Sequence, residues 1–92
     1  MLNQVKAELL VFTAVWCGPC KLTHPIIQKA SLKYRKTLKV TTIDIDKEPS
    51  TAVQYNITGV PVMILLVDGN EVNRLSGVVT EQQLDKFLKP FV

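Results

Sequence analysis

Hydrophobic positions divide the 92-residue chain into segments with strand and helix patterns. Residues 8–14 and Val62–Val67 are apolar runs of the kind found in strands buried on both faces of a sheet. Residues 38–45 are rich in β-branched side chains. Residues 71–76 follow Asp68-Gly69, a dipeptide that favours a tight hairpin turn. These four segments predict four strands, of which the last two are antiparallel.

Helical periodicity occupies much of the remaining chain. From about residue 18, apolar residues recur at intervals of three and four on one face, and these are Leu22, Ile26, Ile27, Ala30 and Tyr34. Pro25 lies inside this pattern and predicts a kink, because its missing N–H removes one helical hydrogen bond. Residues 46–56 indicate a loop and a short helix, with Pro49 near its first turn and Asn56 at its end.

A C-terminal amphipathic helix follows the fourth strand. Thr80 and Gln83 have the spacing of a capping box. Apolar residues then stand at i, i+3, i+4 and i+7, namely Leu84, Phe87, Leu88 and Phe91. A strand, a helix and a strand in one sheet imply a right-handed crossover. We therefore expect one α/β domain over residues 1–92, with a central four-stranded mixed sheet and helices on both faces.

The only two cysteines stand between the first strand and the first helix, in the run Trp16-Cys17-Gly18-Pro19-Cys20. Unpaired N–H groups and the positive end of the helix dipole favour a thiolate over a thiol at this point. Cys17 is the better nucleophile because it is nearer the helix N-terminus, and Cys20 is placed to resolve a mixed disulfide. Gly18 leaves room for a substrate backbone, and Pro19 suits a first helical turn.

A zinc site and an inert thiol pair are the alternative interpretations of this motif. A structural zinc ion needs four ligands, and only His24 could join the two cysteines, so we expect no metal site. Three acids later in the chain, Asp44, Asp46 and Glu48, are typical of a strand end and a loop, and the sequence supplies no further oxygen ligands for a metal cluster. His24 could act as a base near the thiols, but an ordinary solvated histidine is the simpler expectation.

Composition and charge indicate a small globular protein and argue against several classes of partner. A hydrophobic content of 47% is sufficient for one modest core. Eleven basic and eight acidic residues give a net charge of +3 without a basic run or interleaved aromatic residues, so we expect neither nucleic-acid nor membrane binding. No stretch approaches the roughly twenty apolar residues of a membrane span. Glu8 stands where a signal peptide would be basic, so we expect a cytoplasmic protein.

Several later residues accompany the cysteine motif in a recognisable order: the run 16–21, Pro25, Asp44-Ile45-Asp46, Gly59-Val60-Pro61, Asp68-Gly69 and Gly77. Together they resemble the thioredoxin family over essentially the whole chain. The resemblance implies a thioredoxin fold truncated at its N-terminus, since residues 1–7 are too few for the customary first strand and complete first helix. It also implies a cis proline at Pro61, packed beside the sulfur atoms, with the backbone of Val60 free to pair with a substrate.

The resemblance further implies a substrate-binding surface around the cysteines. Its expected members are Trp16, Gly18, Pro19, Gly59, Val60, Pro61 and Gly77. Two positions depart from the family pattern. Val11 replaces a buried acid that assists proton transfer at the second cysteine, and Thr42 replaces a lysine that often accompanies that acid. We therefore expect Cys20 to resolve mixed disulfides more slowly near neutral pH.

The activity implied by the resemblance is thiol–disulfide oxidoreduction without a bound cofactor. Cys17 and Cys20 would reduce protein disulfides, and an NADPH-dependent flavoprotein reductase would restore the dithiol. We expect the protein to act as a monomer. Two alternatives stay open: a binding module or adaptor in which the thiols are secondary, motivated by the short N-terminus and the missing relay residues, and a reductant dedicated to one partner enzyme.

Overall fold

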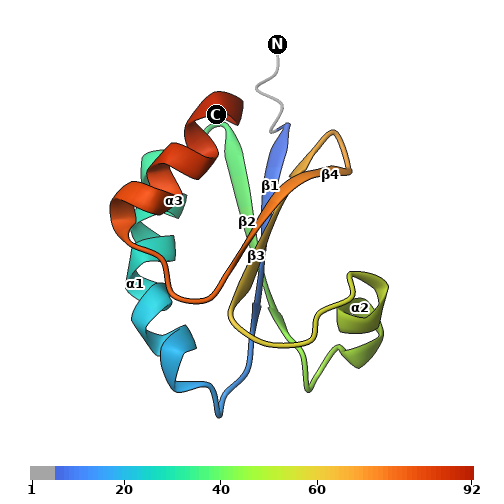
Figure 1. Ribbon diagram of the computed structural model, residues 1–92. Helices are drawn as coiled ribbons and strands as arrows, with labels where there is room; N and C mark the ends of the chain where they lie inside the picture. Colours follow the sequence, from blue (N-terminus) through green and yellow to red (C-terminus); the bar gives the residue numbers. More distant parts are fainter. Residues whose placement is uncertain (1–5) are drawn as a thin grey trace.

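A four-stranded sheet forms the centre of the computed structural model, which describes residues 6–92 (Figure 1). The strands are β1 (Ala7–Thr13), β2 (Leu38–Asp44), β3 (Val62–Val67) and β4 (Asn70–Ser76). The helices are α1 (Gly18–Lys33), α2 (Pro49–Gln54) and α3 (Glu81–Leu88), followed by a 3-10 turn, η1 (Lys89–Phe91). The predicted order of strands and helices is confirmed, and no helix among residues 6–92 is long and apolar enough to cross a membrane.

The strands are arranged in the order β2-β1-β3-β4. β1 and β2 are parallel, with α1 as the crossover between them, whereas β3 pairs antiparallel with both β1 and β4. The turn between β3 and β4 uses Asp68 and Gly69, which both have positive φ angles, of 51° and 83°. This is the backbone conformation that a two-residue hairpin turn requires. The predicted hairpin and the mixed sheet are therefore confirmed.

Two apolar layers lie on opposite faces of the sheet, because successive strand residues point in opposite directions. The layer under α1 and α3 includes Leu9, Met63 and Leu65 from the central strands. The layer on the α2 side includes Phe12 and Ile64. Figure 1 shows α1 and α3 side by side on one face of the sheet and α2 on the other. The two central strands are therefore buried on both faces, as their apolar runs predict.

The orientation of α1 corrects one sequence prediction. Leu22 is 64% exposed instead of lying on the buried face. The residues of α1 that are buried are Cys20, Thr23, Ile27 and Ala30. Leu22 stands about 200° around the helix from Cys20, so burial of the cysteine turns the leucine outward. Pro25 lies within the helix, and the kink stays a prediction. Phe91, predicted on the apolar face of the C-terminal helix, is also exposed, because α3 ends at Leu88 and Phe91 belongs to η1.

Side-chain hydrogen bonds fix α3 at its start and along its length. Thr80 Oγ1 accepts the N–H of Gln83 at 3.1 Å, and Gln83 Oε1 accepts the N–H of Thr80 at 2.8 Å, which confirms the predicted capping box. Asp85 joins α3 to the C-terminal end of α1, because its carboxylate accepts hydrogen bonds from the Tyr34 hydroxyl and, at 2.9 Å, from Lys33 Nζ. The bond from Tyr34, followed by that from Lys33, lowers the pKa of Asp85 below its ordinary value.

Asp85 should make the stability of the fold depend on acid pH. A carboxyl group whose pKa is lower in the folded than in the unfolded state stabilises the fold above its unfolded pKa, and that contribution is lost as the pH falls through the folded pKa. We expect Asp85→Asn to reduce the free energy of unfolding at pH 7 and to differ little from wild type at about pH 2. Urea unfolding between these values measures the difference. Asp68→Asn is the control, and an Asp85→Asn deficit that stays constant with pH would contradict the assignment.

Candidate active site

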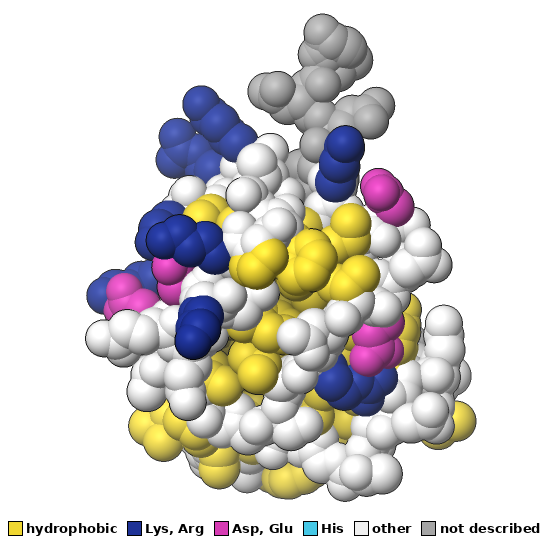
Figure 2. Space-filling view, turned by 45° about the horizontal axis from the view of Figure 1, so that its top comes forward, with side chains coloured by type: hydrophobic (Ala, Val, Ile, Leu, Met, Phe, Trp, Pro, Cys, Tyr) yellow, Lys and Arg dark blue, Asp and Glu magenta, His cyan; other side chains and the backbone are white. Residues whose placement is uncertain are grey.

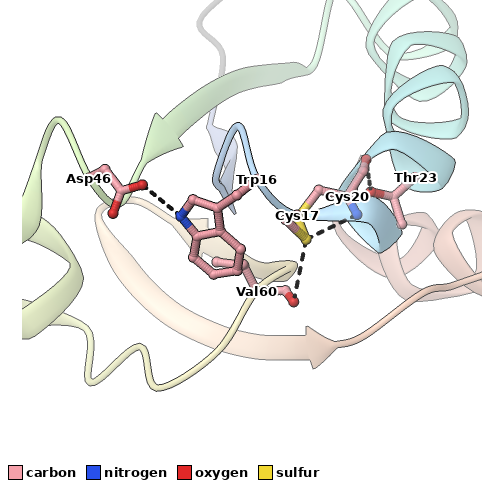
Figure 3. The surroundings of a disulfide bond; sticks show 6 residues. All are labelled: Trp16, Cys17, Cys20, Thr23, Asp46 and Val60. Atoms are coloured by element: carbon pink, nitrogen blue, oxygen red, sulfur yellow. Dashed lines mark hydrogen bonds between the residues drawn. A yellow bond between two sulfur atoms is a disulfide. The ribbon is translucent and has the colours of Figure 1, made fainter.

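A disulfide between Cys17 and Cys20 closes the first turn of α1, and the two Cα atoms are 5.4 Å apart. Cys17 is the N-cap residue of the helix, and its Sγ accepts the N–H of Cys20 at 3.2 Å (Figure 3). Only 3% of Cys17 and 6% of Cys20 is exposed. The sulfur atom of Cys17 therefore lies where an unpaired helix N–H stabilises negative charge, which is the position that the sequence predicts.

The second part of the site comes from the segment before β3. The carbonyl oxygen of Val60 lies 3.7 Å from Cys17 Sγ, although the two residues are 43 positions apart (Figure 3). The Val60–Pro61 peptide bond is cis, as the family resemblance implies. The carbonyl oxygen of Pro61 accepts the N–H of Gly77 at 2.9 Å, which brings the segment after β4 to the same place. Three separate segments thus meet at the disulfide.

Trp16 forms an exposed apolar surface next to the disulfide. Its side chain is held by a hydrogen bond of 2.7 Å from the indole Nε1 to Asp46 Oδ2 (Figure 3). Asp46 is itself positioned by a bond from its N–H to Asp44 Oδ1 at 2.9 Å. The sequence indicates only an ordinary loop acid at this position. The matching Asp44-Ile45-Asp46 run marks the residue, but no spacing rule connects it to a tryptophan thirty positions earlier.

The remaining residues of the predicted substrate surface differ in exposure. Trp16, Gly18, Pro19 and Gly59 are exposed, Val60 and Gly77 are partly buried, and Pro61 is buried. Two further exposed apolar residues adjoin members of this surface in the chain. Val15, 76% exposed, stands beside Trp16, and Val78 follows Gly77 and is also exposed. Sequence reasoning missed Val15, because an apolar residue beside a strand end looks like part of the core.

Neither of the two positions that depart from the family pattern carries an ionisable side chain. Val11 is buried, whereas Thr42 on the edge strand β2 is exposed. The two are direct partners in the β1–β2 register, so both substitutions affect one location in the sheet. His24 is exposed on α1. No cluster of three potential metal-ligating side chains occurs within residues 6–92.

Thr23 is the one buried polar side chain recorded within residues 6–92, and only 2% of it is exposed. Its Oγ1 donates a hydrogen bond of 2.9 Å to the carbonyl oxygen of Cys20 (Figure 3). Such a bond satisfies a buried hydroxyl within the helix. Sequence reasoning missed this residue, because a threonine between apolar helical positions carries no distinctive pattern. Thr23 therefore belongs to the surroundings of the disulfide as a hydrogen-bonded core residue.

Comparison with protein families gives a match to the thioredoxin family model over residues 1–90. The chain belongs to the thioredoxin family. Together with the Cys17–Cys20 pair, this membership makes it a thiol–disulfide oxidoreductase and favours that activity over the adaptor alternative. The family reduces protein disulfides, so the predicted class of substrate is also confirmed.

Proteins from several organisms are similar over nearly all of this thioredoxin-family chain. A thioredoxin of Buchnera aphidicola is 38% identical over 92 residues, which are 100% of this chain and 84% of the relative. A thioredoxin-like protein of Synechocystis sp. is 39% identical over 87 residues, 95% of this chain and 83% of the relative. The structure of a mutant thioredoxin from Halobacterium salinarum superposes with a TM-score of 0.89 at 28% identity, covering 97% of this chain and 77% of that one. The thioredoxin fold is therefore confirmed.

The bond between Trp16 and Asp46 should restrict the indole ring. We expect Asp46→Ala to increase quenching of tryptophan fluorescence by acrylamide, because the ring loses its only recorded hydrogen bond within residues 6–92. Trp16 is the only tryptophan, so the signal reports this site alone. Glu48→Ala, which removes a carboxylate from the same loop, is the control and should leave quenching unchanged. Equal quenching of Asp46→Ala and wild type would show that the bond does not hold the ring in solution.

Proposed function

We propose that this protein reduces protein disulfides by a two-step exchange in which Cys17 is the nucleophile and Cys20 the resolving thiol. The observation that carries this assignment is the position of Cys17 as N-cap of α1, with its Sγ accepting a helix N–H while Cys20 follows one turn inside. The same N–H stabilises a thiolate when the disulfide is reduced. The Cys17–Cys20 bond present in the structure is the oxidised state of this cycle.

The first step is attack by the Cys17 thiolate on one sulfur of the substrate disulfide. A bond forms between Cys17 Sγ and that sulfur while the substrate S–S bond breaks, and the other substrate sulfur leaves with the electron pair. The leaving thiolate then takes a proton from water. The product is a mixed disulfide at the entrance to the site, where Cys17 lies beside the exposed side chains of Trp16 and Val15.

The second step regenerates the disulfide seen here. Cys20 loses its proton, and its thiolate attacks Cys17 Sγ, which breaks the mixed disulfide and releases the second substrate sulfur as a thiol after protonation. Two electrons have then passed from the dithiol to the substrate. Cys20 is buried and the family's internal acid is replaced by Val11, so the proton must leave through another group or through water. This deprotonation should limit resolution near neutral pH.

The substrate is held mainly through its backbone in this proposal. Val60 is partly exposed, and its carbonyl group lies beside Cys17 Sγ, so an extended substrate segment can pair with this residue. Main-chain hydrogen bonds give affinity with little selection among sequences. The surrounding contact surface consists of Trp16, Gly18, Pro19, Gly59, Pro61 and Gly77. Its small and apolar residues suit close approach by another chain.

The domain organisation, the oligomeric state, the reductase and the compartment belong to the same proposal. Residues 1–92 act as one domain, and the monomer is the active form, because both cysteines and the proposed substrate surface belong to one chain. An NADPH-dependent flavoprotein reductase restores the dithiol from its own cofactors, so this chain needs none. The reducing cytoplasm is the compartment that suits a dithiol that must be regenerated.

Reduction of insulin by dithiothreitol tests the assigned roles. We expect wild type to accelerate precipitation of the reduced chains, and Cys17→Ser to abolish the acceleration because no nucleophile remains. In a separate incubation of the pre-reduced variant with insulin and no dithiothreitol, Cys20→Ser should accumulate a mixed disulfide with the substrate, visible by mass spectrometry and released when dithiothreitol is added. Trapping by Cys17→Ser in place of Cys20→Ser would reverse the two roles, and no acceleration by wild type would contradict general reduction of protein disulfides.

Val11→Asp tests the missing proton relay. We expect this variant to resolve mixed disulfides about tenfold faster near pH 7, because a carboxylate at this position can accept the Cys20 proton. Val11→Asn is the matched control, since it buries a polar group of similar size that cannot accept a proton. The rate of resolution is followed from pH 5 to 9 for folded samples. Identical pH profiles of wild type and Val11→Asp would overturn the hypothesis.

A further inference from the structure

Positive charge is concentrated on the side of the molecule formed by α1 and α3. Residues 18–36 contain five basic residues and no acidic residue: Lys21, Lys29, Lys33, Arg35 and Lys36. The remaining six basic residues and all eight acidic residues lie elsewhere in the chain, so the rest of the molecule has a negative formal charge. Figure 2 shows Lys and Arg side chains gathered on the side where α1 and α3 lie, with a few acidic side chains among them.

A groove of about 540 Å³ runs between α1 and α3 within this positive region. Its lining includes three apolar residues, Ile26, Ala30 and Leu84, of which the last two are buried. Its walls include four lysines, two from α1 and two from α3 and η1, namely Lys29, Lys33, Lys86 and Lys89. An apolar floor between ammonium groups fits a ligand that has both carboxylates and an apolar side chain.

Two of the four lysines already bind carboxylates of the groove itself. Lys29 Nζ lies 3.3 Å from Glu81 Oε2, and Lys33 Nζ lies 2.9 Å from Asp85 Oδ1. Lys86 and Lys89 form no ion pair with any residue in the range 6–92. Among residues 6–92, the groove therefore has two lysines without a direct carboxylate partner, at the end formed by the last turn of α3 and the start of η1. Of these, Lys89 is close enough to Asp85 to contribute to the lowered pKa of that carboxyl group.

We propose that the α1–α3 groove docks an acidic segment of a partner protein. Carboxylates of this segment bind Lys86 and Lys89, and an apolar side chain covers Leu84 and Ala30. Charge complementarity and the apolar floor favour such a segment over nucleic acid, because no aromatic or arginine side chain lines the groove to stack on bases. They also favour it over a flat anionic membrane, because the ligand site is concave and two of its lysines are neutralised.

The groove is separate from the disulfide. It is lined by the C-terminal half of α1, by α3 and by the start of η1, whereas the cysteines lie at the N-cap and in the first turn of α1. A partner can therefore be bound in the groove while the disulfide remains accessible to a substrate. The proposal does not depend on the exchange mechanism, because docking requires no free thiol.

The test is a titration of the full oxidised chain with a cysteine-free peptide that carries four glutamates around two leucines. Amide chemical-shift mapping should place the peptide against α1 and α3, and fluorescence anisotropy should show weaker binding as salt rises from about 20 to 300 mM, because screening reduces exposed charge interactions. A peptide with serines in place of the leucines should bind more weakly. Equal binding of the two peptides, or shifts confined to the disulfide region, would overturn the proposal.

Variants that remove the same charge at different places distinguish binding in the groove from general electrostatic attraction to the protein. We expect Lys86→Gln/Lys89→Gln to weaken peptide binding about fivefold, the effect of losing two exposed ion pairs. Lys39→Gln/Lys47→Gln removes the same charge from residues outside the groove and should change affinity less than twofold. Equal weakening by both doubles would contradict a specific site. Tighter binding in the groove of a single-stranded oligonucleotide or of anionic vesicles would assign the surface to a different partner.

Discussion

Pairing of β1 with both β2 and β3 is the constraint on which the redox site depends. The register places Phe12 opposite Val62 and Thr13 opposite Asp44. The last residues of β1 and β2 and the first residue of β3 therefore lie together at one end of the strands. Cys17 follows β1, Pro61 precedes β3, and Asp46 follows β2. A shift of either pairing by one residue would displace these groups by about 3.3 Å relative to one another along the strands.

At Val11 the core of the protein favours stability over an internal proton acceptor. Val11 keeps β1 apolar and packs in the layer under α1 and α3. A carboxyl group at this position would cost about 1–3 kcal/mol of folding free energy even when neutral, unless another group satisfied it. The chain therefore has a continuous apolar core at a position where the resemblance implies a buried acid in many family members. Thr42, opposite Val11 on the edge strand, completes the same replacement with an uncharged side chain.

Much of the fold was predictable because local patterns determine it. The buried strands follow from continuous apolar runs, the hairpin from Asp68 and Gly69, and the start of α3 from Thr80 and Gln83. The side of α1 that faces the sheet was not predictable from the apolar pattern alone, because Leu22 satisfies the helical period on the exposed face. Burial of Cys20 decides the orientation, and that burial depends on tertiary contacts.

Local patterns likewise predict only part of the redox site. The local motif identifies Cys17 and Cys20, and the family resemblance adds the cis peptide before Pro61. The bond between Trp16 and Asp46 escaped prediction, as did the bond between Tyr34 and Asp85. Each of these pairs joins residues at least thirty positions apart through side chains alone. No hydrophobic period or turn signal records such a pair, since its members meet only after the sheet has formed.

The two ends of α1 are electrostatically distinct, although one helix carries both. Lys29 lies nine residues beyond Cys20, which corresponds to about 13 Å along the helix axis. Coulomb interactions weaken with distance, so the lysines of the groove act on the sulfur atoms more weakly than the N–H groups of the first turn do. The N–H groups of the first turn therefore have the larger effect on the stability of a thiolate. The lysines in the later turns of α1 act on a ligand that binds in the groove. Binding in the groove and exchange at the cysteines can thus change independently.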